Sequence, residues 1–276
     1  MAEIIAGSER KPQKVAFIDD QVLLTSGVAA LLASASISIE EFTSIERPEE
    51  FNTFDAVLLD LHLGSGERLQ GCAAVHALVG AGCRVIVISG GSQRVDICDS
   101  IGLGARSYVP KDRPEHLVEV IDRVASGQLV LTGALAGSLR TDLTRRPLKS
   151  DTELHELTPQ EVEFLEEAFH LDGDRSAALA HQWNSSELQD MLNRIWSTCS
   201  LRTASYALKL TPKEIEIVIL SCQLKSRDDV IKRLNIENST YQVHLTKIKT
   251  KYITAYPSAS NLSPQEVIHV LGRRAL

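Results

Sequence analysis

The chain has 276 residues, of which 43% are apolar and 24% charged, a composition typical of a folded globular protein with room for two or three domains. No apolar run reaches the roughly 18 residues that a membrane span requires, so the sequence predicts no transmembrane segment. The five cysteines form no CxxC pair and no zinc-like Cys/His spacing, which argues against a zinc site or a disulfide framework and is typical of reduced thiols in the cytoplasm.

The net charge of −7 is distributed unevenly along the chain. Residues 1–152 carry −5, residues 153–199 carry −8, and residues 200–276 carry +6. Because a polyanion attracts only the last of these segments, any contact with nucleic acid is expected in the C-terminal part of the chain.

The first half of the chain alternates short apolar strands with helical patterns, after a segment at 1–13 that we expect to be flexible and that holds no signal-peptide core. The sequence predicts strands in "KVAFID", "FDAVLLD", "RVIVISG" and "SYVPK", with a weaker one in "ISIEEFT". Helical spacing follows in "LLTSGVAALLAS", "CAAVHALVGAG", "RVDICDSIGLG" and "PEHLVEVIDRVAS". This alternation predicts an α/β domain over residues 14–127, built on a five-stranded doubly wound parallel sheet.

Polar residues stand where the predicted strands end: Asp19, Asp20, Asp60, Ser89 and Lys111. In a parallel sheet these ends meet at one edge, where ligands bind. Three converging carboxylates repel one another, and Mg²⁺ is a hard cation that can offset this charge while leaving positions for water and phosphate. Any one of the five could be an ordinary strand-end residue, but together they favour a site that accepts a phosphoryl group.

The stretches "FIDDQVLLTSGVAALL", "FDAVLLDLHL" and "GLGARSYVPKD" resemble the receiver domains of bacterial response regulators, particularly the NarL/FixJ subfamily. The resemblance implies that Asp60 is the phosphoacceptor, that Ser89 bonds the phosphoryl group and that Lys111 pairs with its charge. It also implies that Tyr108 is the aromatic residue that turns inward when Ser89 moves.

The same resemblance implies a Mg²⁺ site formed by Asp19, Asp20, Asp60 and the main-chain carbonyl of His62. The side chain of His62 allows two interpretations, either an ordinary exposed loop residue or a group that influences hydrolysis of the acyl phosphate.

The second half of the chain repeats one phrase, "LTPQEVE" at 157–163 and "LTPKEIE" at 210–216. Each phrase predicts a helix start, with a threonine as N-cap, a proline in the first turn and a glutamate that completes a capping box. The segments 157–199 and 210–252 align without gaps at an offset of 53 positions. We interpret them as a duplicated unit of short helices.

The second copy resembles a LuxR-type helix-turn-helix, with "NSTYQVHLTKIKTKY" as its recognition helix. The resemblance implies base contacts from Gln242, Val243 and Thr246. It implies phosphate contacts from residues at both ends of the helix: Ser239, Thr240, Lys247, Lys249 and Lys251. Four departures weaken it: Tyr241, Gln242 in place of a usual lysine, Leu224 where a turn glycine with positive φ is usual, and Glu237 where a serine usually caps the recognition helix.

The first copy keeps the apolar pattern but is acidic, with Asp190 and Asn193 at the positions of Val243 and Thr246. Because phosphate contacts dominate DNA affinity, we do not expect this copy to bind DNA. Two interpretations remain open: an interaction module that docks the receiver, the basic copy or a second protomer, or a degenerate spacer with a solvated acidic face.

The expected organisation is an α/β receiver followed by all-α tandem helix-turn-helix units, with a linker containing a short helix at 128–156, the acidic unit at 157–200 and the DNA-binding domain at 205–276. The function predicted is that of a cytoplasmic, phosphorylation-regulated DNA-binding transcriptional regulator of a two-component system, with a histidine kinase as partner, a homodimeric state, and no enzymatic or membrane role. One alternative is a signalling adaptor that binds only proteins. Another is a receiver that serves solely as a dimerisation platform.

Overall fold

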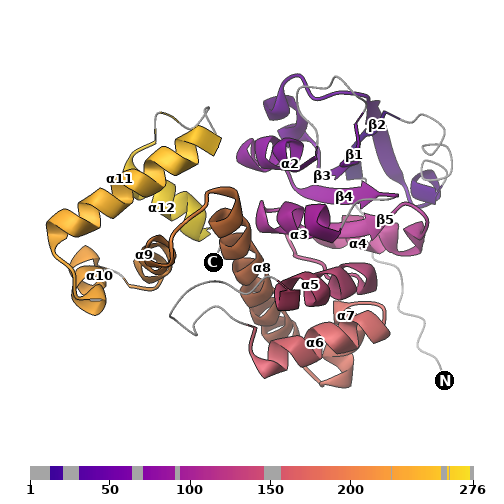
Figure 1. Ribbon diagram of the computed structural model, residues 1–276. Coiled ribbons are helices and arrows are strands. Elements are labelled where there is room, and N and C mark those ends of the chain that lie inside the picture. The colour runs from indigo at the N-terminus through magenta and orange to yellow at the C-terminus, as the bar shows by residue number, and fades with distance from the viewer. Residues whose placement is uncertain are drawn as a thin grey trace. The chain divides into compact units, whose positions relative to one another are not determined.

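A computed structural model describes residues 13–20, 31–63, 71–90, 94–145, 157–224, 226–255, 260 and 262–273. Residues 1–12 of the predicted flexible N-terminus, most of the first predicted helix and the linker residues 146–156 lie outside the described residues, whereas Gln13 is part of a strand. The chain divides into two compact units, Met1–Ser92 with Ala105–Val130, and Gln93–Gly104 with Leu131–Leu276. The first contains the strands and the second only helices (Figure 1).

The first unit is built on a parallel sheet of five strands in the order β2-β1-β3-β4-β5. The strands are β1 (Gln13–Ile18), β2 (Ile37–Phe42), β3 (Ala56–Leu59), β4 (Val85–Ser89) and β5 (Ser107–Pro110). The predicted five-stranded parallel sheet is confirmed, including the weak strand. β3 and β4 are buried at every position, which explains their continuous apolar sequence.

Alternate residues of the strands face opposite sides of this sheet. On one side, Val15, Leu58 and Ile86 share a buried cluster with Val120 and Ile121 of α4 (Leu117–Ala125). α2 (Gly71–Gly80) contacts β4, and the short 3₁₀ helices η1 (Pro48–Thr53) and η2 (Pro114–His116) precede β3 and α4. Helices therefore cover the sheet as the alternation of strands and helices predicts.

The second unit is entirely helical over its described residues. Its helices are α3 (Arg94–Gly102), α5 (Gly133–Arg145), α6 (Pro159–His170), α7 (Asp174–Ala180), α8 (Ser185–Ala207), α9 (Pro212–Gln223), α10 (Arg227–Leu234), α11 (Asn238–Ala255) and α12 (Pro264–Arg273). None of the described helices combines the length and the apolar character that a membrane span requires. The all-helical C-terminal region predicted from the sequence is confirmed.

Two features of these helices go beyond what the sequence predicts. α8 runs without interruption through the boundary expected at 200–205, because buried residues such as Cys199 and Leu201 continue its apolar face. Leu224 adopts an extended conformation with φ −101°, so the turn after α9 does not need the positive φ that would strain a leucine.

The repeated phrase forms the same local structure twice. Thr158 and Thr211 each accept a hydrogen bond from the backbone N–H of the glutamate three residues later, and each glutamate accepts one from the backbone N–H of its threonine. Both capping boxes are therefore present as predicted, and each satisfies N–H groups that the helix leaves unpaired.

Candidate functional site

The backbone at the strand ends is fixed by hydrogen bonds that extend the sheet. The N–H of Asp19 donates to the carbonyl of Phe42 at 3.0 Å, and that of Asp60 donates to the carbonyl of Ile18 at 3.0 Å. The N–H of Lys111 donates to the carbonyl of Ser89 at 3.2 Å. The sheet therefore places these polar side chains on a rigid edge, which is what a preorganised site requires.

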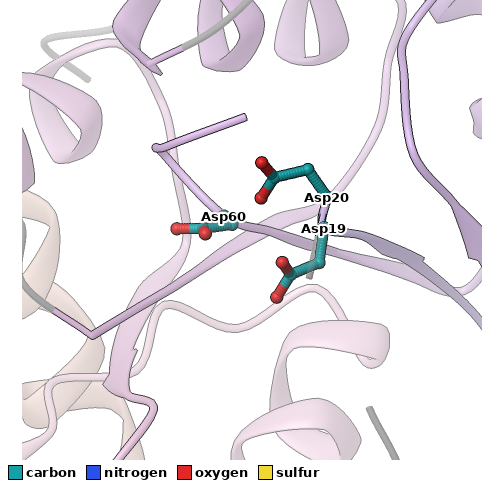
Figure 2. Close-up of side chains that lie close together, drawn as sticks. All are labelled: Asp19, Asp20 and Asp60. Carbon is teal, nitrogen blue, oxygen red and sulfur yellow. The ribbon is translucent and has the colours of Figure 1, made fainter. Parts of the chain in front are cut away.

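Three carboxylates meet at this edge, from Asp19, Asp20 and Asp60. One oxygen of each lies within 4.8 Å of the others. Figure 2 shows Asp19 and Asp20 projecting from the end of β1 beside Asp60, which follows β3. Asp19 and Asp60 are buried, whereas Asp20 is exposed and faces solvent. We call these three residues the acidic cluster.

Lys111 joins two members of the acidic cluster. Its ammonium nitrogen lies 2.6 Å from Asp19 Oδ2 and 2.8 Å from Asp60 Oδ2, with all three side chains less than 10% exposed, at 7%, 3% and 4%. Burial by itself would lower the pKa of Lys111, but the hydrogen bonds and charges of Asp19 and Asp60 hold it above its ordinary value. Lys111 is therefore a permanent cation bound directly to the predicted phosphoacceptor.

Ser89 lies at the same edge and is almost fully buried, at 1% exposure. Its hydroxyl is 3.5 Å from Nδ1 of His62, whose backbone N–H donates to Asp60 Oδ1 at 3.2 Å. The Tyr108 hydroxyl donates to the carbonyl of Ser89 at 3.4 Å, and the ring is buried. Burial, and then the charge of Asp112, raises the pKa of Tyr108.

The structure thus brings together every receiver residue that the sequence singled out. The turn of Tyr108 that the resemblance implies stays a prediction. The contact between His62 and Ser89 was not predicted, because no pattern in the sequence shows that a loop side chain reaches a neighbouring strand.

The acidic cluster has the chemistry of a divalent cation site. Three carboxylates carry three negative charges, of which Lys111 offsets one. Carboxylate oxygens at this spacing are the ligands that Mg²⁺ prefers, and the exposed Asp20 leaves a route for water to the cluster. The residues present therefore fit Mg²⁺.

A second group of predicted residues lies on one face of α11. Ser239, Thr240, Val243, Thr246 and Lys247 are exposed, whereas Gln242 is partly buried. The opposite face packs into the core through residues such as Tyr241, Leu245 and Ile248. The exposed positions follow the helical repeat, so they form a single surface.

Lys251 is placed differently from the other lysines of α11. Its ammonium donates to Glu214 Oε2 at 2.6 Å and to the carbonyl of Lys209 at 2.8 Å. Burial by itself would raise the pKa of Glu214, but the hydrogen bonds from Lys251 and Thr211 and the charge of Lys251 lower it. Lys251 thus fastens α11 to the capping box of α9. The capping-box pattern in the sequence predicts the bonds between Glu214 and Thr211, but it does not predict the bond from Lys251.

No protein-family model matches the chain. Its sequence is 28% identical over 165 residues to the nitrate/nitrite response regulator protein NarL of Escherichia coli K12. The aligned region covers 57% of this chain and 76% of that protein. The transcriptional regulatory protein ComA of Bacillus subtilis is 24% identical over 163 residues, covering 56% and 76%. The signal receiver domain of a NarL response regulator from Mycobacterium tuberculosis has a TM-score of 0.38 at 22% identity, covering 43% of this chain and 100% of that domain. The chain is therefore related by sequence to the response regulator NarL and the transcriptional regulatory protein ComA.

Proposed function

We propose that the chain is a phosphorylation-regulated, DNA-binding transcriptional regulator of a two-component system. A histidine kinase would phosphorylate Asp60, and the C-terminal helices would bind DNA in response. The observation that carries the proposal is the placement of Lys111, bonded to both Asp19 and Asp60 within the acidic cluster. The sequence relationship to NarL and ComA supports the same function.

Phosphoryl transfer at this site needs little covalent chemistry from the protein. A carboxylate oxygen of Asp60 attacks phosphorus while the bond from phosphorus to the kinase histidine breaks. The imidazole keeps the bonding pair and takes up a proton. Lys111 remains to pair with the phosphoryl oxygens, and the Ser89 hydroxyl is close enough to the edge to donate to one of them after a small shift.

When bound, Mg²⁺ would neutralise phosphoryl oxygens and the carboxylates that approach them. Asp19, Asp20 and Asp60 would hold it, and the carbonyl of His62 remains a predicted fourth ligand. The side chains of the chain itself set the geometry, because Asp19 and Asp60 are already fixed by Lys111.

Mg²⁺ is expected to stabilise the sheet unit against unfolding. At ten times its dissociation constant, a ligand that binds only the folded state adds about 1.4 kcal/mol. Asp20→Asn removes a ligand without breaking a bond to Lys111, so this variant should lose most of the gain while keeping its stability in EDTA. Thermal unfolding across a Mg²⁺ titration measures the effect. Asp112→Asn, an exposed carboxylate outside the acidic cluster, is the matched control and should respond as the unaltered protein does.

The two capping-box phrases support the proposal that α6–α8 and α9–α11 are two copies of one helix-turn-helix unit. Their helices begin at Pro159 and Pro212, Asp174 and Arg227, and Ser185 and Asn238, each pair being 53 positions apart. The buried core positions Leu192 and Ile195 of the first copy match Leu245 and Ile248 of the second at the same offset.

Only the second copy is suited to DNA. In the first, the basic residue at the position of Lys247 is Arg194, and its Nε donates to the buried Glu161 at 3.2 Å. Its neighbour Asp190 is exposed and would repel phosphate. We therefore place DNA recognition on α11, where a homodimer would present two such helices to paired half-sites.

DNA selection from a pool of genomic fragments, at several salt concentrations, tests the proposal. The full-length protein is compared with and without acetyl phosphate and Mg²⁺, beside Asp60→Asn. We expect the unaltered protein to enrich a discrete DNA sequence, and to enrich it more strongly after phosphorylation. In Asp60→Asn, treatment with the phosphoryl donor should not increase the enrichment. Absence of DNA binding at every salt concentration, with Asp60 still phosphorylated, would contradict the DNA-binding part.

A signalling adaptor is the second candidate. It is favoured by the exposed apolar side chains of the first copy, Phe169, Leu171 and Leu179, the last of them 72% exposed. Exposed apolar side chains on a copy that carries excess negative charge would suit a contact with another protein. The outcome described above, phosphorylation without DNA binding, would select this candidate.

A further inference from the structure

The geometry points to a role for the first helical copy: it reads the state of the phosphorylation site by holding α3, the helix that follows the strand of Ser89. This inference rests on the proposed function, because it names the element that carries the signal from Asp60 to the DNA-binding helices. α3 lies within the sequence range of the receiver, yet its residues cluster with the helical unit.

The contact between α3 and α8 is close-packed around Gly102, the last residue of α3. A Cβ atom at this position would lie 2.7 Å from the carbonyl oxygen of Cys199 and 2.0 Å from the Thr203 hydroxyl. Ser200, on the same face of α8, donates its hydroxyl to the carbonyl of Gly102 at 2.9 Å, and the bond is buried. Only glycine allows the two helices to approach so closely, so their relative position is specific. We call Gly102, Cys199, Ser200 and Thr203 the glycine seam.

A charged side chain of α8 joins the region of the glycine seam to α5. Arg202 is buried and donates to the carbonyl of Leu143, near the end of α5. Burial raises the pKa of the Cys199 thiol to about 12. The charge of Arg202 lowers this pKa, whereas the charges of Asp142 and Asp99 raise it. Helices α3, α5 and α8 therefore share a buried, charged junction, where a shift of one helix is costly unless the others follow.

Other residues in the same stretch of the chain belong to the core of the helices that we propose bind DNA. Leu201 and Leu208 share a buried cluster with Ile215 of α9, Leu245 of α11 and Leu271 of α12. A small cavity is lined by residues at all three helices: Gly102 and Leu103 at the end of α3, Ser200, Thr203 and Ala204 of α8 with the following Leu208, and Leu271 of α12. α8 is therefore one uninterrupted helix that contacts both α3 and the buried cluster of α9, α11 and α12.

The chain connection completes the argument. Ser89 ends β4, and α3 begins five residues later, at Arg94. A displacement of Ser89 by a phosphoryl group on Asp60 would pull on α3, and the glycine seam would pass that displacement to α8. The first copy has lost the DNA surface but kept a rigid core, which suits it to this transmitting role.

Gly102→Ala tests the inference, with Gly80→Ala as the matched control. Both glycines are the last residue of their helix, but a Cβ at Gly80 would meet nothing within 4 Å. Hydrogen exchange of the full-length protein should show protection in α3 and in residues 198–207 reduced about tenfold in Gly102→Ala and unchanged in Gly80→Ala. Ser200→Ala, which removes one hydrogen bond, is the milder second variant and should shift exchange in the same direction.

Phosphorylation is then added with acetyl phosphate and Mg²⁺, and the phosphorylated fraction is measured by mass spectrometry. In the unaltered protein and in Gly80→Ala we expect phosphorylation to change exchange in residues 198–207 and to change DNA affinity. In Gly102→Ala, with Asp60 equally phosphorylated, both responses should be lost, and Ser200→Ala should reduce them.

The outcomes separate the two proposals. If both seam variants are phosphorylated and respond as fully as the control, the inference is overturned while the proposed function stands. If the unaltered protein is phosphorylated but binds no DNA, the exchange response of residues 198–207 still decides the inference. If Asp60 accepts no phosphoryl group in any variant, the proposed function is overturned and the inference with it.

Discussion

Replacing Lys111 with methionine is expected to lower the free energy of unfolding of the sheet unit by about 3 kcal/mol in EDTA. The ammonium is bonded to Asp19 and Asp60, whose side chains are 3% and 4% exposed. Without it, two buried carboxylates in contact range have no counter-charge, and each was desolvated on folding. Mg²⁺ should restore part of the loss, because it neutralises the same oxygens.

Urea unfolding followed by hydrogen exchange of the sheet amides measures this loss, since both tryptophans, Trp183 and Trp196, report only on the helical unit. The matched control is Lys14→Met. Lys14 pairs with Glu40 at 2.9 Å, but the two side chains are 54% and 50% exposed, so its loss should cost less than about 1 kcal/mol. Equal stability of the two variants in EDTA would contradict the interpretation that Lys111 neutralises the acidic cluster.

Replacing Lys251 with methionine is expected to destabilise the packing of α11 on α9 by about 2 kcal/mol at neutral pH. Glu214, 2% exposed at its side chain, would keep its capping bonds to Thr211 but lose the bonded ammonium. Lys213→Met is the control, because its pair with Glu216 at 3.0 Å involves a lysine that is 41% exposed and should contribute about 0.5 kcal/mol. Hydrogen exchange along α11 compares the two.

The pH dependence of this deficit has a definite sign. The pKa of Glu214 is lowered from its ordinary value of 4.5 by the folded state, so the pair contributes its full stability above that value and loses it as pH falls through the lowered one. The difference between Lys251→Met and the unaltered protein should therefore be constant at neutral pH and shrink below pH 4.5. A deficit that grows on acidification would exclude the Glu214 pair as its cause.

Salt dependence separates this structural role from the phosphate contact expected from the sequence. Lys247 is exposed on the surface of α11 that also carries Val243. Lys247→Met should reduce the slope of DNA affinity against salt by about one phosphate contact. Lys251→Met should weaken binding with the slope unchanged, because the ammonium is already bonded to Glu214 and to the backbone.

The sequence by itself determined the strands of the sheet and which polar residues stand at the ends of those strands. Strands buried on both faces are continuous apolar runs, and a parallel sheet brings their carboxyl ends to one edge, so Asp19, Asp60 and Lys111 had to converge. The helix starts at Thr158 and Thr211 were equally determined, because a capping box depends only on residues three positions apart.

Only the tertiary structure decided which polar groups pair across elements and which helices pack together. The bonds from Lys251 to Glu214 and from Arg194 to Glu161 join residues more than 30 positions apart, and no local pattern specifies them. The contact of Gly102 with Cys199 and Thr203 is of the same kind, since a glycine at a helix end can serve either as a stop or as a site of close approach. Local sequence sets backbone conformation and periodicity, but the choice between these uses depends on the shape and charge of surfaces that exist only after the chain has folded.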